Sequence, residues 1–247
     1  MRVLVFDLKG SLAHFRKIYT NSSSLSYSLP PRTCLAGIIA AMLGRERDSY
    51  YQEFSREHSF IAVKKLGRTR KIMQTLNYMR ATGSRELIVP REHTQIPFEL
   101  VCGEPELRYR IYFAGNPGAY EELKQRLVND KYVFPPYLGA APFSATANFV
   151  AEASCQRLQT RGLVEVSTPI KSRNIVEFSF DRMLDNVALV KEKMPVDFTA
   201  ERYPVASASY VYDENASALP VSLNEDMCWR IAYQWEEQDI KENITFY

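Results

Sequence analysis

The sequence predicts an α+β fold in which strands and helices alternate through the first half and strands predominate in the second. Residues 2–8 are apolar on both alternating faces, which is typical of a central strand covered on both sides. A strongly helical run ends at Leu43, and beyond residue 145 strand-like segments follow one another. With 247 residues, 46% of them hydrophobic, the chain can bury a sizeable core.

The first predicted helix follows the strand at residues 2–8 after a polar stretch. Pro30-Pro31 precedes it, and Gly44 stands where a helix commonly ends in a left-handed residue. One stripe of this helix is apolar and another consists of small residues, so we expect it to approach a sheet closely and to be buried.

A strand is expected at Ser59–Leu66, and residues 107–113 alternate cleanly between apolar and polar positions. Asn116-Pro117 then starts a second amphipathic helix that runs to Asn129. A fourth strand near Tyr132–Leu138 would complete a βαββαβ ferredoxin-like unit.

We therefore expect a ferredoxin-like domain at residues 1–145 and a smaller β-rich part at residues 146–247. The topology of the second part cannot be read from the sequence, but its strands are expected at Leu163–Thr168, Ile175–Phe180, Ala206–Tyr212 and Cys228–Trp235.

The small net charge of +2 hides a strong asymmetry along the chain. Residues 1–97 carry 16 Lys/Arg against 7 Asp/Glu, whereas the remainder carries 15 against 22. This split suggests a polyanion bound by the first half and a protein partner for the second. The alternative is a solvated hairpin whose charges only keep an exposed edge soluble.

Targeting and cysteine patterns favour a cytoplasmic protein. The longest apolar run, Cys34–Leu43, is about half of the roughly 20 residues that a membrane-spanning helix needs. The first eight residues lack the apolar stretch of a signal peptide. The four cysteines are widely spaced without a CxxC pair, which disfavours a structural zinc site and a disulfide scaffold.

The polar loop Ser11–Thr33 leads into a helix N-terminus, where free N–H groups and the helix dipole stabilise an anion. We expect Arg16, Lys17 and Arg32 to bind backbone phosphates there. The alternative is that Arg32 simply points to water.

The basic window Ile61–His93 supplies the second candidate site. Its thirty or so residues between two strands are long for a structureless loop, so we expect a protruding hairpin that lies against RNA. Tyr78 could stack on an unpaired base. The expected phosphate contacts are Lys64, Lys65, Arg68, Arg70, Lys71 and Arg80.

Catalysis has weaker support than binding. His14, Lys17 and Tyr19 are the best-grouped candidates for metal-independent RNA cleavage. Yet a basic RNA-contacting loop would look the same, and no metal-binding or nucleotide-binding motif appears. We expect no enzyme activity, no metal and no cofactor.

Several segments carry a family resemblance. FDLKG, LAHFRK, YTNSSSLSY, LPPRT and GIIAAMLGRERDSYY, all within Phe6–Tyr51, resemble the start of the fifth CRISPR-associated family, here called Cas-five. The version found in type I-B systems fits best. HTQIPFEL at residues 93–100, PYLG at 136–139 and NITFY at 243–247 look like further pieces of the same pattern.

The resemblance implies a RAMP-type ferredoxin or RRM-like domain with a basic β-hairpin "thumb" at about residues 67–97. It implies that the protein caps one end of the Cascade antiviral surveillance complex and holds the 5′ handle of the CRISPR RNA. Its partners would be a Cas-seven backbone subunit and a Cas-eight large subunit, with target DNA met indirectly through the complex and no membrane contact.

By position, the handle-contacting loop would include Lys9, His14, Tyr19, Asn21 and Ser22, besides the cations already named. One subtype uses this family as a repeat-processing nuclease, but no adjacent Lys-His match is present here. We therefore expect a non-catalytic RNA-binding subunit. The alternatives are a metal-independent endoribonuclease that acts on the repeat and a protein scaffold without RNA contact.

Overall fold

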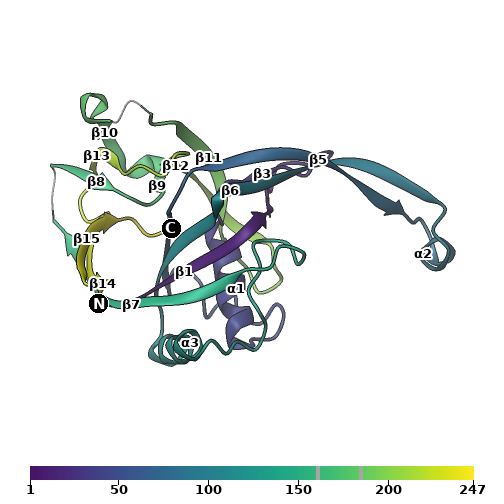
Figure 1. Ribbon diagram of the computed structural model, residues 1–247, viewed down its shortest axis with the longest axis horizontal. Coiled ribbons are helices and arrows are strands. Elements are labelled where there is room, and N and C mark those ends of the chain that lie inside the picture. The colour runs from purple at the N-terminus through teal and green to yellow at the C-terminus, as the bar shows by residue number, and fades with distance from the viewer. Residues whose placement is uncertain (160–161, 184–185) are drawn as a thin grey trace.

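A computed structural model describes residues 1–159, 162–183 and 186–247 (Figure 1). Its helices are α1 (Arg32–Leu43), α2 (Ser84–Ile88) and α3 (Pro117–Asn129), with short 3-10 turns η1 (Ser172–Asn174) and η2 (Phe180–Arg182). The strands of the first part are β1 (Arg2–Ala13), β2 (Phe15–Arg16), β3 (Ser26–Tyr27), β4 (Phe60–Lys65), β5 (Thr69–Arg80), β6 (Glu92–Ala114) and β7 (Thr146–Leu158). The later strands are β8 (Leu163–Val166), β9 (Ile170–Lys171), β10 (Ile175–Phe178), β11 (Leu189–Phe198), β12 (Pro204–Asp213), β13 (Leu219–Leu223), β14 (Cys228–Trp235) and β15 (Gln238–Ile244).

One large sheet runs through the molecule in the order β10-β13-β8-β15-β14-β7-β1-β6-β4. Strand β1 lies between β6 and β7 and is antiparallel to both. Its even residues Leu4, Phe6 and Leu8 belong to the core under α1 and α3, whereas Val3 and Val5 belong to the core on the opposite face. The prediction of a central strand covered on both sides is confirmed.

The helix boundaries follow from local chemistry. Gly44 ends α1 in the left-handed conformation at φ 73°, and its N–H bonds the carbonyls of Ala40 and Ala41. Pro117 opens α3, and the Asn116 side chain accepts the N–H of Ala119 at 2.8 Å. Both helices lie close to where the sequence predicts them.

The fourth strand of the first unit is predicted wrongly. Residues 132–138 form no strand beyond an isolated bridge at Tyr137, and β7 occupies the place beside β1 instead. The predicted boundary at residue 145 thus falls directly before a strand that pairs with β1 on one side and β14 on the other. The sheet continues without a break from the first half into the second.

The sheet curls so that its distant strands meet. The Lys64 Nζ of β4 lies 2.6 Å from the Glu242 carboxylate of β15, although β14, β7, β1 and β6 separate the two strands in the sheet. The shorter sheet β11-β12-β9 adds Met194, Tyr210 and Tyr212 to the core of α1. None of the described helices is long and apolar enough to cross a membrane.

Beyond this body, β5 and β6 form a long antiparallel hairpin that reaches outward, with α2 at its tip (Figure 1). Thr69 pairs with Gly103 near the base and Arg80 with Glu92 near the tip. A hairpin therefore stands where the basic window lies in the sequence. Most of its residues between Arg70 and Arg80 are exposed.

Candidate nucleic-acid interface

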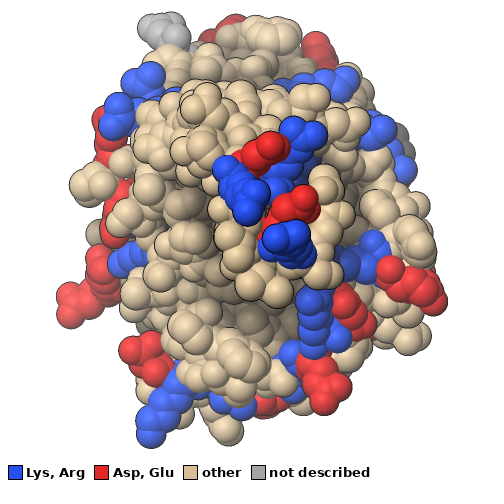
Figure 2. All heavy atoms as spheres, turned by 90° about the vertical axis from the view of Figure 1, so that its right-hand side faces the viewer, with Lys and Arg blue, Asp and Glu red and all other residues tan. Residues whose placement is uncertain are grey.

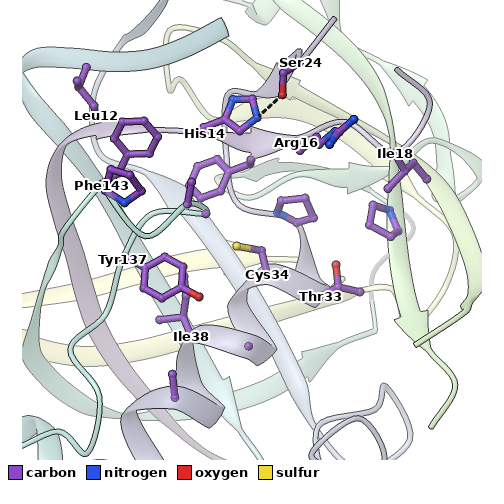
Figure 3. Close-up of a pocket in the computed structure, with 18 of the residues that line it drawn as sticks. Leu12, His14, Arg16, Ile18, Ser24, Thr33, Cys34, Ile38, Tyr137 and Phe143 are labelled. Carbon is purple, nitrogen blue, oxygen red and sulfur yellow. Dashed lines mark hydrogen bonds between the residues drawn. The ribbon is translucent and has the colours of Figure 1, made fainter. Parts of the chain in front are cut away.

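A groove of about 790 Å³ opens where the hairpin leaves the body. Its walls come from α1, from β2, from residues 74–78 and 98–100 of the β5–β6 hairpin, from the loop at residues 136–143 and from β11. Figure 3 shows Thr33, Cys34 and Ile38 of α1 lying across from Tyr137 and Phe143 of that loop. The groove therefore joins segments that are up to 190 residues apart in the sequence, from Leu12 to Arg202.

Eight Phe and Tyr side chains contribute to the lining of this groove. Tyr78 and Tyr137 are 47% and 41% exposed, so each presents a free ring surface. Phe98 lies 6.4 Å from Phe143 and stacks on His14 at 3.9 Å, which makes a continuous apolar wall. Exposed rings in a groove are the feature on which unpaired bases stack.

His14 forms part of this wall and is only 5% exposed. Its Nδ1 lies 2.7 Å from the Glu99 carbonyl, and its Nε2 lies 2.9 Å from the Ser24 hydroxyl (Figure 3). Because the carbonyl can only accept, Nδ1 carries the proton and Nε2 accepts from Ser24. Burial lowers the pKa of His14, so the ring is neutral at neutral pH.

Exposed cations surround the groove and follow the hairpin. Arg16 and Arg202 lie at the groove itself. Arg68 is exposed in the turn before β5, while Arg70 and Arg80 lie 3.7 and 3.5 Å from the exposed acids Glu104 and Glu92. Figure 2, which faces the hairpin tip, shows acidic side chains among the basic ones. Such exposed ion pairs are weak and leave these arginines available to phosphates.

Lys17 and Tyr19 share a different partner. The Lys17 Nζ lies 2.6 Å from the Glu192 carboxylate, and the Tyr19 hydroxyl donates to its other oxygen at 3.0 Å. Burial alone would lower the pKa of Lys17, but the bond to Glu192 outweighs it and raises the pKa. Among the described residues no hydrogen bond joins His14 to Lys17 or Tyr19, so the three do not form a preassembled acid–base set.

Both expectations for Arg32, a phosphate contact and a side chain that points to water, are wrong. Its side chain is 1% exposed and bonds the Asp197 carboxylate at 2.9 Å, with Ser59 accepting at its other terminal nitrogen. A guanidinium taken out of water needs such partners, because it cannot lose its proton at ordinary pH. Burial lowers the pKa of Arg32 without changing this. Arg32 therefore pins α1 to β11 and is not at the groove surface.

Two of the lysines assigned to the hairpin also lie elsewhere. Both belong to β4, where Lys65 is 6% exposed and donates to Thr69 and to the Glu214 carbonyl. Burial lowers the pKa of Lys65 to about 8. Lys64 pairs with Glu242 on the opposite side of the sheet from the groove. These two residues stabilise the body, so their assignment to phosphate contacts is corrected.

The remaining predicted residues are spread over both faces. Lys9 shares a face of β1 with Val5, away from the α1 side. Asn21 and Ser22 are exposed in the loop between β2 and β3. Lys71 donates to the Ser26 carbonyl at 2.8 Å. Of the residues singled out in the sequence, the structure brings His14, Arg16 and Tyr78 together at the groove.

Comparison with known proteins identifies the family. The model of the family described as CRISPR-associated protein (Cas_Cas5) matches residues 3–152, more than half of the chain. The chain belongs to the Cas-five family. No curated protein matches it significantly.

Solved structures agree on the fold of this Cas-five chain. A crystal structure of a CRISPR protein from Archaeoglobus fulgidus aligns with a TM-score of 0.52 over 98% of this chain and 99% of that one, at 13% identity. A Type III-B Cmr-beta structure, described as bound to cognate target RNA and AMPPnP, aligns with a TM-score of 0.52 over 89% and 86% of the chains, at 11% identity. At such identities the likeness shows a shared fold.

The sequence-based prediction for this Cas-five protein missed most of the residues that line the groove. Phe98, Tyr137 and Phe143 line it but stand in segments that carry no charge signal. The available signal was the turn at residues 136–139, where Gly139 has φ +86° and approaches the His14 carbonyl so closely that a Cβ would lie 2.1 Å from it. Glu192, which holds Lys17 and Tyr19, had no signal at all in the sequence.

Proposed function

We propose that this Cas-five protein is a non-catalytic subunit of a type I-B Cascade antiviral surveillance complex, where it holds the 5′ handle of the CRISPR RNA and caps the backbone. Under this proposal β1, α1, β4, β6, α3 and β7 form its ferredoxin-like RAMP domain. The β5–β6 hairpin is its thumb.

The groove beside the β5–β6 hairpin is the observation that carries the proposal. It combines free ring surfaces at Tyr78 and Tyr137 with the cations Arg16 and Arg202. Aromatic faces and nearby cations are what single-stranded RNA requires, because bases stack while phosphates need positive charge. A wall of neutral His14 and Phe98 adds apolar surface without a competing charge.

The state of His14 supports binding rather than cleavage. A general base for the ribose hydroxyl needs a free ring nitrogen, whereas the His14 nitrogens face the Glu99 carbonyl and the Ser24 hydroxyl. Lys17 and Tyr19 are engaged with Glu192. Cleavage by these three would require all of these bonds to break first.

The proposed partners are the CRISPR RNA, a Cas-seven backbone subunit and a Cas-eight large subunit, with target DNA reached through the complex. Membership of the Cas-five family supports a place in such an assembly. The similarly folded Cmr-beta structure, described as bound to target RNA, supports an RNA ligand for this fold.

Affinity for a labelled repeat-derived RNA, measured across a salt series, tests the proposal. We expect Tyr78→Ala and Tyr137→Ala each to weaken binding by about 1–3 kcal/mol, the value of one stacked base. Tyr203→Ala is the matched control, since Tyr203 is 70% exposed and does not line the groove. Equal affinities for all three variants and the wild type would remove the groove from the RNA-binding surface.

The same RNA run on a denaturing gel tests the non-catalytic part. We expect it to stay intact. Cleavage that disappears in His14→Ala or Tyr19→Phe would instead establish the endoribonuclease alternative, and absence of binding at low salt would favour the scaffold.

A further inference from the structure

A second cationic site lies where the start of α1 meets the three-stranded sheet. Arg32 begins α1, Arg56 precedes β4, Lys171 ends β9 and Arg173 lies in η1. Lys171 pairs directly with Tyr210 of β12, and its Nζ lies 6.0 Å from the Tyr210 ring centroid. We call these four cations the α1–β9 cluster.

One carboxylate serves two members of this cluster. Asp197 accepts from the Arg32 guanidinium at 2.9 Å, while its other oxygen accepts the Arg56 backbone N–H at 3.0 Å and lies 4.0 Å from the Arg56 guanidinium. Among the described residues, no ion pair is formed by Lys171 or Arg173. Positive charge in the cluster therefore exceeds the negative charge that Asp197 supplies.

The ionisation of Lys171 reflects this excess. Burial lowers its pKa to about 8, and the charges of Arg173, Arg56 and Arg32 act in the same direction, against Asp197. Like charges held this close in a half-buried place destabilise one another unless an anion joins them. The sequence around Lys171 gives no hint of this arrangement, because the cations come from four separate segments.

Two buried donors in the cluster also lack an acceptor. They are the Tyr210 hydroxyl and the Arg32 Nε, in side chains that are 0% and 1% exposed. Burial raises the pKa of Tyr210, and the positive charges of Arg32, Arg173 and Arg56 oppose that shift. Buried donors are nearly always paired, so this place in the fold lacks an acceptor.

We propose that the α1–β9 cluster binds a phosphate group, with Arg56, Lys171 and Arg173 as its ligands and Arg32 and Tyr210 behind them. Arg56 is 48% exposed and Arg173 is exposed, so the site is open to solvent on their side. Guanidinium groups match the geometry of phosphate oxygens, and a lysine adds a point charge. None of these residues lines the groove.

The site nevertheless borders the groove, because Thr33 and Phe198, the chain neighbours of Arg32 and Asp197, line it. A phosphate of RNA that leaves the groove and a free phosphate ion would present the same chemistry. The two sources are separated by experiment.

Thermal unfolding of the full chain in inorganic phosphate, against sodium chloride of equal ionic strength, tests the site directly. We expect phosphate to raise Tm by at least about 5 °C at one hundred times its Kd. Lys171→Met and Arg173→Gln should abolish this phosphate-specific rise. Arg182→Gln, an exposed arginine of η2 outside the cluster, is the matched control and should keep it.

Equal melting in the two salts would overturn the proposal, as would an unchanged phosphate effect in Arg173→Gln. Arg173 is exposed, so that variant is expected to fold and the test stays decisive even if Lys171→Met does not. This readout needs no RNA, so it stands or falls separately from the role of the groove.

The salt dependence of RNA binding then shows whether the phosphate belongs to the RNA backbone or is a free ion. If a backbone phosphate occupies the site, Arg173→Gln should reduce the slope of log affinity against log salt by about 0.7, the value of one phosphate on a single strand. Inorganic phosphate should also compete with the RNA. If Arg173→Gln leaves this slope unchanged but abolishes the phosphate-specific rise in Tm that the wild type shows, the ligand is a free phosphate ion.

Discussion

Replacement of Asp7 by Asn should destabilise the protein strongly while leaving RNA binding intact. The Asp7 carboxylate accepts two hydrogen bonds from the Arg110 guanidinium, at 2.8 and 2.9 Å. Both side chains are nearly buried, at 6% and 4% exposure. Arg110 also donates to the Tyr233 hydroxyl at 3.0 Å and lies 4.3 Å from the Trp235 ring centroid, so this pair ties β1 and β6 to β14.

The expected loss of stability follows from the hydrogen bond and the negative charge that Asn cannot supply. Its amide nitrogen would face a guanidinium nitrogen, so one hydrogen bond is lost and the buried cation keeps no counter-charge. Breaking a buried ion pair from one side costs about 3–5 kcal/mol. For a chain of this length, 3 kcal/mol corresponds to a fall in Tm of about 6–12 °C.

Thermal and urea unfolding measure this loss, with Glu92→Gln as the control. Glu92 pairs with Arg80 on the hairpin, but the two are 70% and 64% exposed, so its loss should cost less than about 0.5 kcal/mol. The double variant Asp7→Leu with Arg110→Met should recover most of the stability, because an apolar pair leaves no charge unpaired. A loss in Asp7→Asn no larger than that in Glu92→Gln would refute the reasoning.

Further predictions concern the site and the response to pH. Since burial lowers the pKa of Lys65 from 10.5 to about 8, the folded state binds fewer protons than the unfolded state between these values. The free energy of unfolding, measured by urea titration, therefore rises by on the order of 3 kcal/mol as pH increases from 8 toward 10, and this rise should be missing in Lys65→Met. Gly139→Ala should lower both Tm and RNA affinity, because the left-handed backbone and the contact with the His14 carbonyl exclude a Cβ. Gly67→Ala, where a Cβ meets nothing within 4 Å, should change neither, and an equal effect of the two would count against the packing argument. Arg68→Gln should reduce the salt slope of RNA binding by about 0.7 while leaving Tm unchanged, and a slope equal to that of the wild type would exclude a phosphate contact there.

Sequence periodicity located the elements whose signals are local. The apolar strand β1 shows on both faces because both faces are buried, and α1 ends at Gly44 because only a residue tolerant of positive φ fits there. The prediction of a fourth strand near residues 132–138 was wrong because the apolar residues there lie in a loop. Tyr132 donates to the Ala147 carbonyl, and Val133 donates its N–H to the Met42 carbonyl in the last turn of α1.

The candidate site was less predictable, because charge along the chain does not show which side chains are buried. The sequence predicts Arg32 and Lys65 to be surface cations, yet their partners Asp197 and Glu214 are 165 and 149 residues away. Tyr78 was found because an aromatic residue stood among cations in an unusually long connection. The other rings of the groove stand in neutral segments, and only the tertiary fold brings them to Tyr78.

Ion pairs with these distant partners account for part of the charge asymmetry between the two halves of the chain. Lys17, Arg32, Lys64 and Lys65 of the basic first half pair with acids of the second half, as Lys17–Glu192, Arg32–Asp197, Lys64–Glu242 and Lys65–Glu214. All four cations are mostly buried, so a part of the excess positive charge is neutralised within the chain and does not call for an external polyanion. The acidic second half is thus, in part, the counter-ion of the first.

A chain that ended at residue 145 would leave these four cations without their carboxylates and β1 without β7. Unpaired buried charges cost several kcal/mol each, so the two halves are expected to fold as one body. The cations left for an external ligand are those without a buried acid. Among them, those on the hairpin and at the groove, together with Lys171 and Arg173 of the α1–β9 cluster, mark the surfaces where RNA and phosphate binding should be sought.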